Sequence, residues 1–168
     1  MSRSRAVSIA LALALMLGLL AQGTLASDGS RLILKARTMV GIPDAFTGTK
    51  APIRGINGGG LPWMLKHARV VLRSDGHLIV KVEGLVLAAG ANAGSNPVNP
   101  FAAVVSCLKS DATVANVMTP TFPATTGPAS AGGGNARFEG DVVLPSPCIA
   151  PIVFVTSGTG AWFASTGG

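Results

Sequence analysis

Hydrophobic and polar residues alternate with a period of two along most of this chain, which is the pattern of half-buried β-strands. The clearest example is the stretch from His67 to Leu87, which is interrupted by Ser-Asp-Gly at residues 74–76. Leu72 before that turn must share a face with Leu78 after it. Pairing the two predicts a β-hairpin whose three-residue loop ends on Gly76 in the left-handed conformation.

The same pattern predicts a series of further strands, and the rest of the chain shows no convincing helical period. These strands are residues 31–40, 101–108, 113–118, 136–144, 152–156 and 161–164. Short strands at this spacing, separated by turn residues, are typical of all-β domains. We therefore predict one antiparallel β-sandwich, with a closed β-barrel as the alternative.

The stretch "PSPCIAPIVFVTSGTGAWFA", residues 145–164, predicts a second hairpin with a two-residue Gly-Thr turn. This register places Val155 opposite Trp162 and Phe154 opposite Phe163. We expect Phe154 and Phe163 in the core. Trp162 is then expected on the outer side or beneath a long loop, where its ring can stack on a ligand.

The N-terminus has the pattern of a secretory signal. Two arginines precede an uncharged apolar stretch from Ala6 to Ala21, and small residues then permit cleavage after Ala26. An uncleaved membrane anchor is the alternative, but the stretch is shorter than the roughly 20 residues that span a bilayer. We therefore predict a cleaved signal peptide, residues 1–26, and a single secreted domain, residues 27–168, without a membrane span. The cell envelope and the periplasm are alternative destinations.

Cys107 and Cys148 are the two cysteines of the chain. In an exported domain they are expected to form one disulfide bond. A zinc site needs at least two more ligands, and His67 and His77 do not lie at ligand spacing from the cysteines.

Basic residues are concentrated in the first half of the chain. The sequence has 13 Lys and Arg and 7 Asp and Glu, a net charge of +6, and without Arg3 and Arg5 of the leader the net charge is +4. Nine basic residues lie between Arg31 and Lys81. Such an asymmetry suits an anionic partner such as a cell-envelope polymer. The charges occur singly along the alternating strands, which favours a solvated sheet face instead. We expect no nucleic-acid partner, because aromatic residues are not interleaved with the basic residues.

Motifs for cofactor binding or catalysis are not found in the sequence. The Gly58–Gly60 cluster lacks the phosphate-loop pattern, and no GxSxG elbow occurs. We therefore expect no enzyme activity, no cofactor and no metal. Two alternatives remain: a glycan hydrolase using Glu139 and Asp141, which share one strand face, and a metal-binding module using His67, His77 and neighbouring acids.

Long loops rich in glycine and proline cover residues 41–63, 88–100 and 119–135. Loops of this length are commonly functional or mobile. Trp63 lies at the end of the first loop and Trp162 lies in the C-terminal hairpin. These two aromatic residues are the candidate ligand-binding residues.

The segments "GGGLPW", "DGHLIVKVEGLVL", "FPATTGPAS" and "PCIAPIVFVTSGTGAWFA" resemble a family of small uncharacterised secreted bacterial proteins. The order "MVGIPDAFTG" then "VLRSDGHLIVKVEGL" is similar to the first strands of the CHRD domain, an extracellular β-sandwich module, although the AHIH-type motif of that domain is absent. The resemblance implies an immunoglobulin-like or CHRD-like sandwich. We therefore expect a secreted, non-enzymatic module that binds an envelope polymer or another secreted protein.

Overall fold

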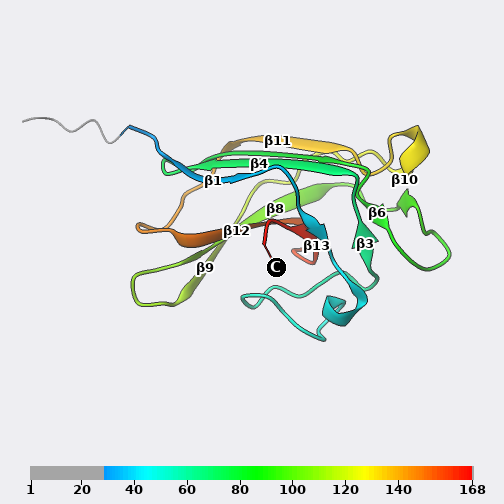
Figure 1. The fold of residues 1–168 in the computed structure, drawn as a ribbon, viewed down its shortest axis with the longest axis horizontal. Helices are drawn as coiled ribbons and strands as arrows, with labels where there is room; N and C mark the ends of the chain where they lie inside the picture. The colour runs from blue at the N-terminus through cyan, green and yellow to red at the C-terminus, as the bar shows by residue number, and fades with distance from the viewer. Residues whose placement is uncertain (1–28, 168) are drawn as a thin grey trace, which may run out of the picture.

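The alternating segments form two antiparallel sheets in the computed structural model, which describes residues 29–167. Sheet A contains, in spatial order, β1 (Leu32–Ala36), β4 (His67–Arg73), β5 (His77–Glu83) and β11 (Ala136–Asp141). Sheet B contains β2 (Val40–Gly41), β13 (Trp162–Ser165), β12 (Ile149–Ser157), β8 (Phe101–Leu108) and β9 (Val114–Met118). Figure 1 shows the two sheets stacked, with sheet A above sheet B. The all-β prediction is confirmed, and within the described residues neither sheet closes into a barrel. The predicted leader, residues 1–26, lies outside the described residues.

Smaller elements join the ends of the two sheets. They are the strand pairs β3 (Trp63–Met64) with β6 (Val86–Leu87) and β7 (Ser95–Asn96) with β10 (Gly127–Pro128), and the 3₁₀ turns η1 (Asp44–Phe46) and η2 (Ala129–Ala131). All of them lie within or beside the three long loops of the sequence. These loops are therefore tied to one another by short backbone ladders.

The β4–β5 hairpin has the predicted register. Leu72 pairs with Leu78, and the pairing continues as far as His67 opposite Glu83. Gly76 has a φ of +93°, and its N–H donates to the Arg73 carbonyl at 3.0 Å. The left-handed conformation expected at the end of this loop is confirmed.

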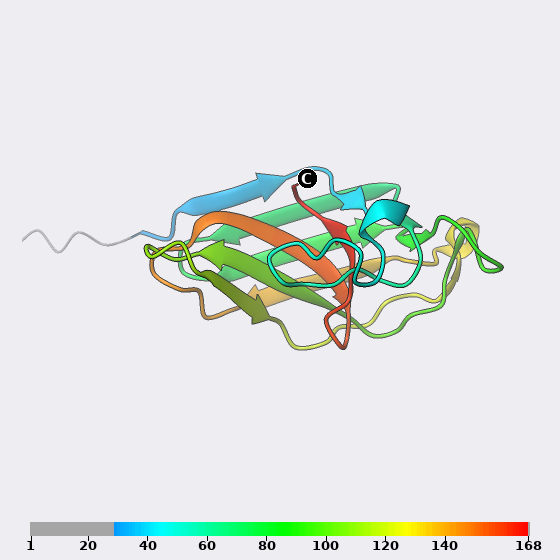
Figure 2. The same cartoon turned by 90° about the horizontal axis from the view of Figure 1, so that it is seen from below.

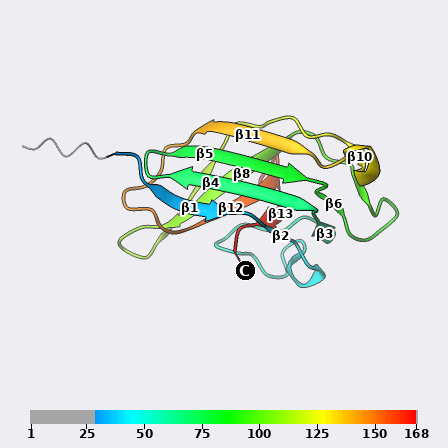
Figure 3. The ribbon, with the colours of Figure 1, turned by 45° about the horizontal axis from the view of Figure 1, so that its top comes forward.

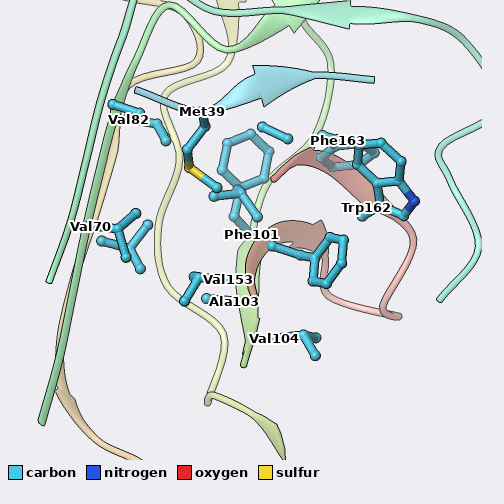
Figure 4. Close-up of a cluster of buried hydrophobic side chains, with 14 of the residues drawn as sticks. Met39, Val70, Val82, Phe101, Ala103, Val104, Val153, Trp162 and Phe163 are labelled. Atoms are coloured by element: carbon cyan, nitrogen blue, oxygen red, sulfur yellow. The ribbon is translucent and has the colours of Figure 1, made fainter. Parts of the chain in front are cut away.

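Inward-facing side chains of both sheets form one core. Val70 and Val82 of sheet A are at most 1% exposed, and Ala103 and Val153 of sheet B are fully buried. Figure 4 shows Val153 and Ala103 directed toward Val70, with Met39 above them. Because strand side chains alternate between faces, this shared layer determines which residues of sheet A point outward.

The outer face of sheet B is also covered. Residues 42–62, here called the strap, lie across β12 and β13, as Figure 2 shows. The Arg54 guanidinium holds the strap to the sheet by donating to the carbonyls of Ser106 at 2.9 Å and Ala150 at 2.8 Å. Every residue of β8 from Phe101 to Cys107 is consequently buried.

The C-terminal hairpin differs from its predicted register. Thr156, not Val155, pairs with Trp162, and a bulge follows before Val155 pairs with Ala164. The cause is a longer turn, in which the Ser157 N–H donates to the Ala161 carbonyl at 2.8 Å. The bulge separates Phe154 from Phe163, so the predicted pairing of these two residues is wrong.

The aromatic side chains of this hairpin pack on two different sides. Phe154 lies against Trp162 under the strap, with ring centroids 5.8 Å apart, whereas Phe163 contacts Phe101 at 5.8 Å. Phe154 and Phe163 are both buried, as expected. Trp162 lies beneath the strap, which was one of the two positions expected for it.

The predicted strand 31–40 is divided between the sheets. Ala36 pairs with Val70 in sheet A, whereas Val40 pairs with Ser165 in sheet B. A register shift between Leu32 and Leu34 also interrupts the alternation. Leu32 and Val40, two apolar residues of the predicted strand, are 51% and 56% exposed and do not belong to the core.

Candidate anion-binding face

Four basic residues cross the outer face of sheet A in one row. Arg69 of β4 pairs with Lys81 of β5, and Lys81 pairs with Arg137 of β11. Arg37 follows Ala36, whose partner is Val70, so Arg37 extends the row at the level of Arg69. Figure 3 shows the four strands of this face side by side. We call Arg37, Arg69, Lys81 and Arg137 the cation row; with about 4.8 Å between neighbouring strands, it spans about 14 Å.

The row points to solvent because its neighbours along each strand point to the core. Ala68 and Val70 flank Arg69 and are buried, and Val82 follows Lys81 in the same way. The side chains of Lys81 and Arg137 are 48% and 58% exposed. The sheet therefore holds the Cα atoms of the cations at fixed spacing and leaves the charged groups in water.

Carboxylates neutralise one half of the row. Lys81 Nζ lies 2.6 Å from Glu83 Oε1, and Arg137 forms an ion pair with Glu139. The hydrogen bond and the charge of Lys81 lower the pKa of the Glu83 carboxyl below its ordinary value. For Arg37 and Arg69, by contrast, residues 29–167 place no carboxylate within ion-pair distance. Among the described residues, the members of the cation row without a carboxylate partner therefore lie at β1 and β4.

A hollow of about 250 Å³ lies in this part of the face. It is lined by Lys35, Arg37 and Arg69 together with the small residues Ala36 and Ala68. We call it the basic notch. Guanidinium groups donate in a planar fork that matches a carboxylate or phosphate group, and Lys35 adds a third positive charge. The arrangement can bind one anionic group through several charge-assisted hydrogen bonds.

Glu139 and Asp141 share the outer face of sheet A, as the sequence predicts for a carboxylate pair. His77 lies beside both, with Nδ1 3.0 Å from Asp141 Oδ1 and Nε2 3.9 Å from Glu139 Oε1. The side chains of Glu139 and Asp141 are 47% and 79% exposed. These three residues form an open ladder of polar contacts across β5 and β11, where water competes for the side-chain groups.

The two histidines lie at opposite ends of the β4–β5 hairpin. His67 faces Glu83, and Glu83 is six residues along β5 from His77, which corresponds to about 20 Å in an extended strand. The fold therefore separates the two imidazoles suggested for a metal site. In the part of the chain that the structure describes, no three His, Cys, Asp or Glu side chains are grouped to hold a metal ion.

Both candidate aromatic residues belong to the core. Trp63 is 5% exposed, and Trp162 is 2% exposed. Trp63 stacks on Phe163, and Trp162 packs edge-on against Phe46 of the strap at 6.3 Å. In this conformation neither indole presents a ring face to solvent.

The predicted disulfide is present. Cys107 of β8 and Cys148, which precedes β12, are joined with an S–S distance of 2.00 Å and a Cα–Cα distance of 5.0 Å. Ile149 pairs with Leu108 directly beside it. The bond thus links neighbouring strands of sheet B at the end where Arg54 also holds the strap.

The excess of basic residues is evident from the sequence, but the cation row is not. The predicted register of the β4–β5 hairpin is sufficient to place two of the row's four members, because pairing Leu72 with Leu78 puts Arg69 opposite Lys81. Arg37 and Arg137 join them only through the order of strands in sheet A. That order depends on contacts between segments far apart in the sequence.

Comparison of the chain with protein-family models, curated proteins and solved structures found no match. Over residues 29–167, the structure contains no helix with the length and apolar character needed to cross a membrane.

Proposed function

We propose that this protein is a secreted, non-enzymatic binding module that holds an anionic polymer of the cell envelope on the outer face of sheet A. The observation that carries the proposal is the cation row, in which Arg37 and Arg69 lie beside each other without a nearby carboxylate among the described residues. The leader pattern and the disulfide support secretion. The basic notch provides the first contact for a carboxylate or phosphate group of the polymer.

Repulsion within the row favours an anionic ligand. Unit charges 4 Å apart repel by about 1 kcal/mol in water, and by more near a protein surface. Glu83 and Glu139 relieve this repulsion over β5 and β11. Over β1 and β4 a bound anion would relieve the repulsion in the same way. A polymer with one charge per repeat unit can contact several members of the row at once.

The neighbouring rows favour a polysaccharide over a single-stranded nucleic acid. Next to the cation row, Val71 pairs with Ile79, and both are half-buried apolar residues that can contact the C–H groups of sugar rings. In the strands of sheet A, the described outward-facing residues include no Phe, Tyr or Trp for base stacking.

The experiment measures binding of the full chain, expressed with its leader under oxidising conditions, to polygalacturonate and to neutral dextran of similar length. The test variant is Arg37→Gln with Arg69→Gln. The matched control is Lys50→Gln with Lys109→Gln, which removes the same charge away from sheet A.

We expect polygalacturonate, but not dextran, to bind, and the affinity to fall as salt increases because counterions are released. The test variant should lose roughly tenfold or more in affinity, since each charge-assisted hydrogen bond contributes about 1.5–3 kcal/mol. The control should stay within about twofold of the unmodified chain. Equal losses in both variants, tighter binding to single-stranded DNA, or no binding at low salt would each overturn the proposal.

We also propose an immunoglobulin-like or CHRD-like fold. An immunoglobulin-like or CHRD-like sandwich is supported by two antiparallel sheets around a shared core. Membership in the family of small secreted bacterial proteins is supported by the motifs quoted above.

A further inference from the structure

The backbone of β9 has one hydrogen-bonding edge that faces no other strand among residues 29–167. Lys109 N–H donates to the Thr113 carbonyl, and Thr119 N–H donates to the Ala103 carbonyl, both at 2.9 Å. Along an antiparallel strand, the backbone N–H and C=O groups of successive residues point to opposite sides. Because residues 113 and 119 bond toward β8, residues 115 and 117 also do so. The N–H and C=O groups of Val114, Asn116 and Met118 therefore point away from β8. The strand itself lies at the margin of sheet B (Figure 2).

The other three edges of the two sheets have features that hinder pairing with a further strand. β1 carries Lys35 and a register shift, β11 carries three charged residues, and β2 is only two residues long. β9 has the sequence Val-Ala-Asn-Val-Met, without a charge, a proline or a bulge. Uncharged and flat edges of this kind pair with further strands.

The sequence of β9 is complementary to itself when it is read in the opposite direction. With Asn116 placed on a two-fold axis, Val114 faces Met118 of a second copy, and Ala115 faces Val117. Every apolar residue then meets an apolar residue, and Asn116, whose Nδ2 donates to the Arg54 carbonyl at 3.0 Å, meets Asn116 of the second copy. Val114 and Met118 are 42% and 43% exposed in the single chain. We infer that two copies of this chain associate through their β9 strands, antiparallel about Asn116, to form one continuous sheet.

Charge also favours a second copy at this edge. Two molecules with an excess of basic residues repel each other, and the repulsion is least where neither surface carries charge. In this arrangement, Val114, Asn116 and Met118 of each copy form hydrogen-bonded pairs with the other copy. The contact is small beside the roughly 1,600 Å² of a stable complex, so we expect association to depend on concentration.

The inference is tested by sedimentation equilibrium and hydrogen exchange on the full chain with its disulfide intact. We expect the mass to rise from the monomer value toward twice that value with increasing concentration. The amides of Val114, Asn116 and Met118 should gain protection over the same range. The amides of Ala115 and Val117, which already face β8, should not change.

Two variants distinguish β9 pairing from other contacts. Val114→Lys with Met118→Lys places like charges opposite each other, whereas Val114→Lys with Met118→Asp places opposite charges together. We expect the first to raise the dissociation constant roughly tenfold or more and the second to retain the dimer. Val143→Lys with Thr126→Lys, at two exposed positions, is the control for added charge and should also retain it.

A chain that stays monomeric at millimolar concentration overturns the inference. The inference is also overturned if the two β9 variants change the dissociation constant equally. It is overturned as well if the protection gained on association is confined to amides outside β9. Polymer binding by the cation row does not depend on this result, because sheet A and β9 carry separate sets of residues.

Discussion

The indole ring of Trp63 stacks on the ring of Phe163, with 4.1 Å between the ring centroids and 23° between the ring planes. The contact joins the residue that follows the strap to the last strand of the chain. On the other side of sheet B, Trp162 packs against Phe46 of the strap. The strap and the C-terminal hairpin therefore share one core and should lose stability together.

Phe163→Ala and Trp162→Ala should each lower the free energy of unfolding by about 3–5 kcal/mol, because each removes a buried aromatic side chain. Thermal and denaturant unfolding measure the effect. Val143→Ala, at a residue that is 89% exposed, is the control and should be close to neutral. A Trp162→Ala variant with an unchanged melting temperature would contradict the burial of this ring.

Gly76→Val should be more damaging than Gly55→Val. Both glycines have positive φ, +93° and +78°, which costs a residue with a side chain about 1–2 kcal/mol. A Cβ atom at Gly76 also overlaps the carbonyl of Val142, whereas the described residues leave open space beside Gly55. Urea unfolding measures the free energy of unfolding of both variants, and the difference between them isolates the additional clash. We expect Gly76→Val to lose about 1–3 kcal/mol more than Gly55→Val. Equal losses would show that the β4–β5 turn can move away from Val142.

The disulfide should resist alkylation unless the protein is reduced. Intact mass should show no alkylated cysteine before reduction and two after it. Replacing Cys107 and Cys148 by alanine opens a loop with a sequence separation of 41 and should remove about 4 kcal/mol of stability by the chain-entropy estimate. The β-sheet circular dichroism should persist at low temperature, because the apolar core remains. Alkylation without reduction would contradict the bond.

Arg54→Met should loosen the strap without unfolding the sheets. The substitution removes two charge-assisted hydrogen bonds, to the carbonyls of Ser106 and Ala150. Acrylamide should then quench tryptophan fluorescence more strongly, since Trp162 lies beneath the strap. Arg37→Met, on sheet A, is the matched control and should leave quenching unchanged. Identical quenching in both variants would mean that Arg54 does not hold the strap.

Asp111 should contribute to stability at neutral pH and lose that contribution in acid. Thr113 donates to Asp111 Oδ1 from its side chain at 2.6 Å and from its backbone at 3.0 Å, and these bonds lower the pKa of the carboxyl below its ordinary value of 3.8. A lowered pKa in the folded state stabilises the fold above the unfolded pKa, and this effect disappears as the pH falls through the folded pKa.

The measurement for Asp111 is the melting temperature of Asp111→Asn and of the unmodified chain between pH 7 and pH 2. The two should differ at pH 7 and converge below about pH 3.8 as the carboxyl protonates. A constant difference across this range would contradict the assignment.

Local patterns were sufficient to predict much of the fold. The β4–β5 hairpin follows from the alternation on each side of residues 74–76, because a shift of one residue would move every apolar side chain to the wrong face. β8 was predicted with its observed bounds, Phe101–Leu108, and the Cys107–Cys148 bond followed from the number of cysteines and the leader pattern. The predicted register of the C-terminal hairpin was wrong because its turn is one residue longer than expected and introduces a bulge.

The sequence alone determined the periodicity of the strands, the excess of basic residues and the disulfide partners, because these depend on neighbouring residues or on composition. Only the tertiary structure decided which residues lie together on a surface. Arg37 follows β1, Arg69 lies on β4 and Arg137 lies on β11, and they align because β1, β4, β5 and β11 are ordered by contacts across the core. The burial of Trp162 was decided in the same way, since it depends on a strap more than 100 residues earlier in the chain. Alternation specifies a face for each strand, and long-range packing determines what covers that face.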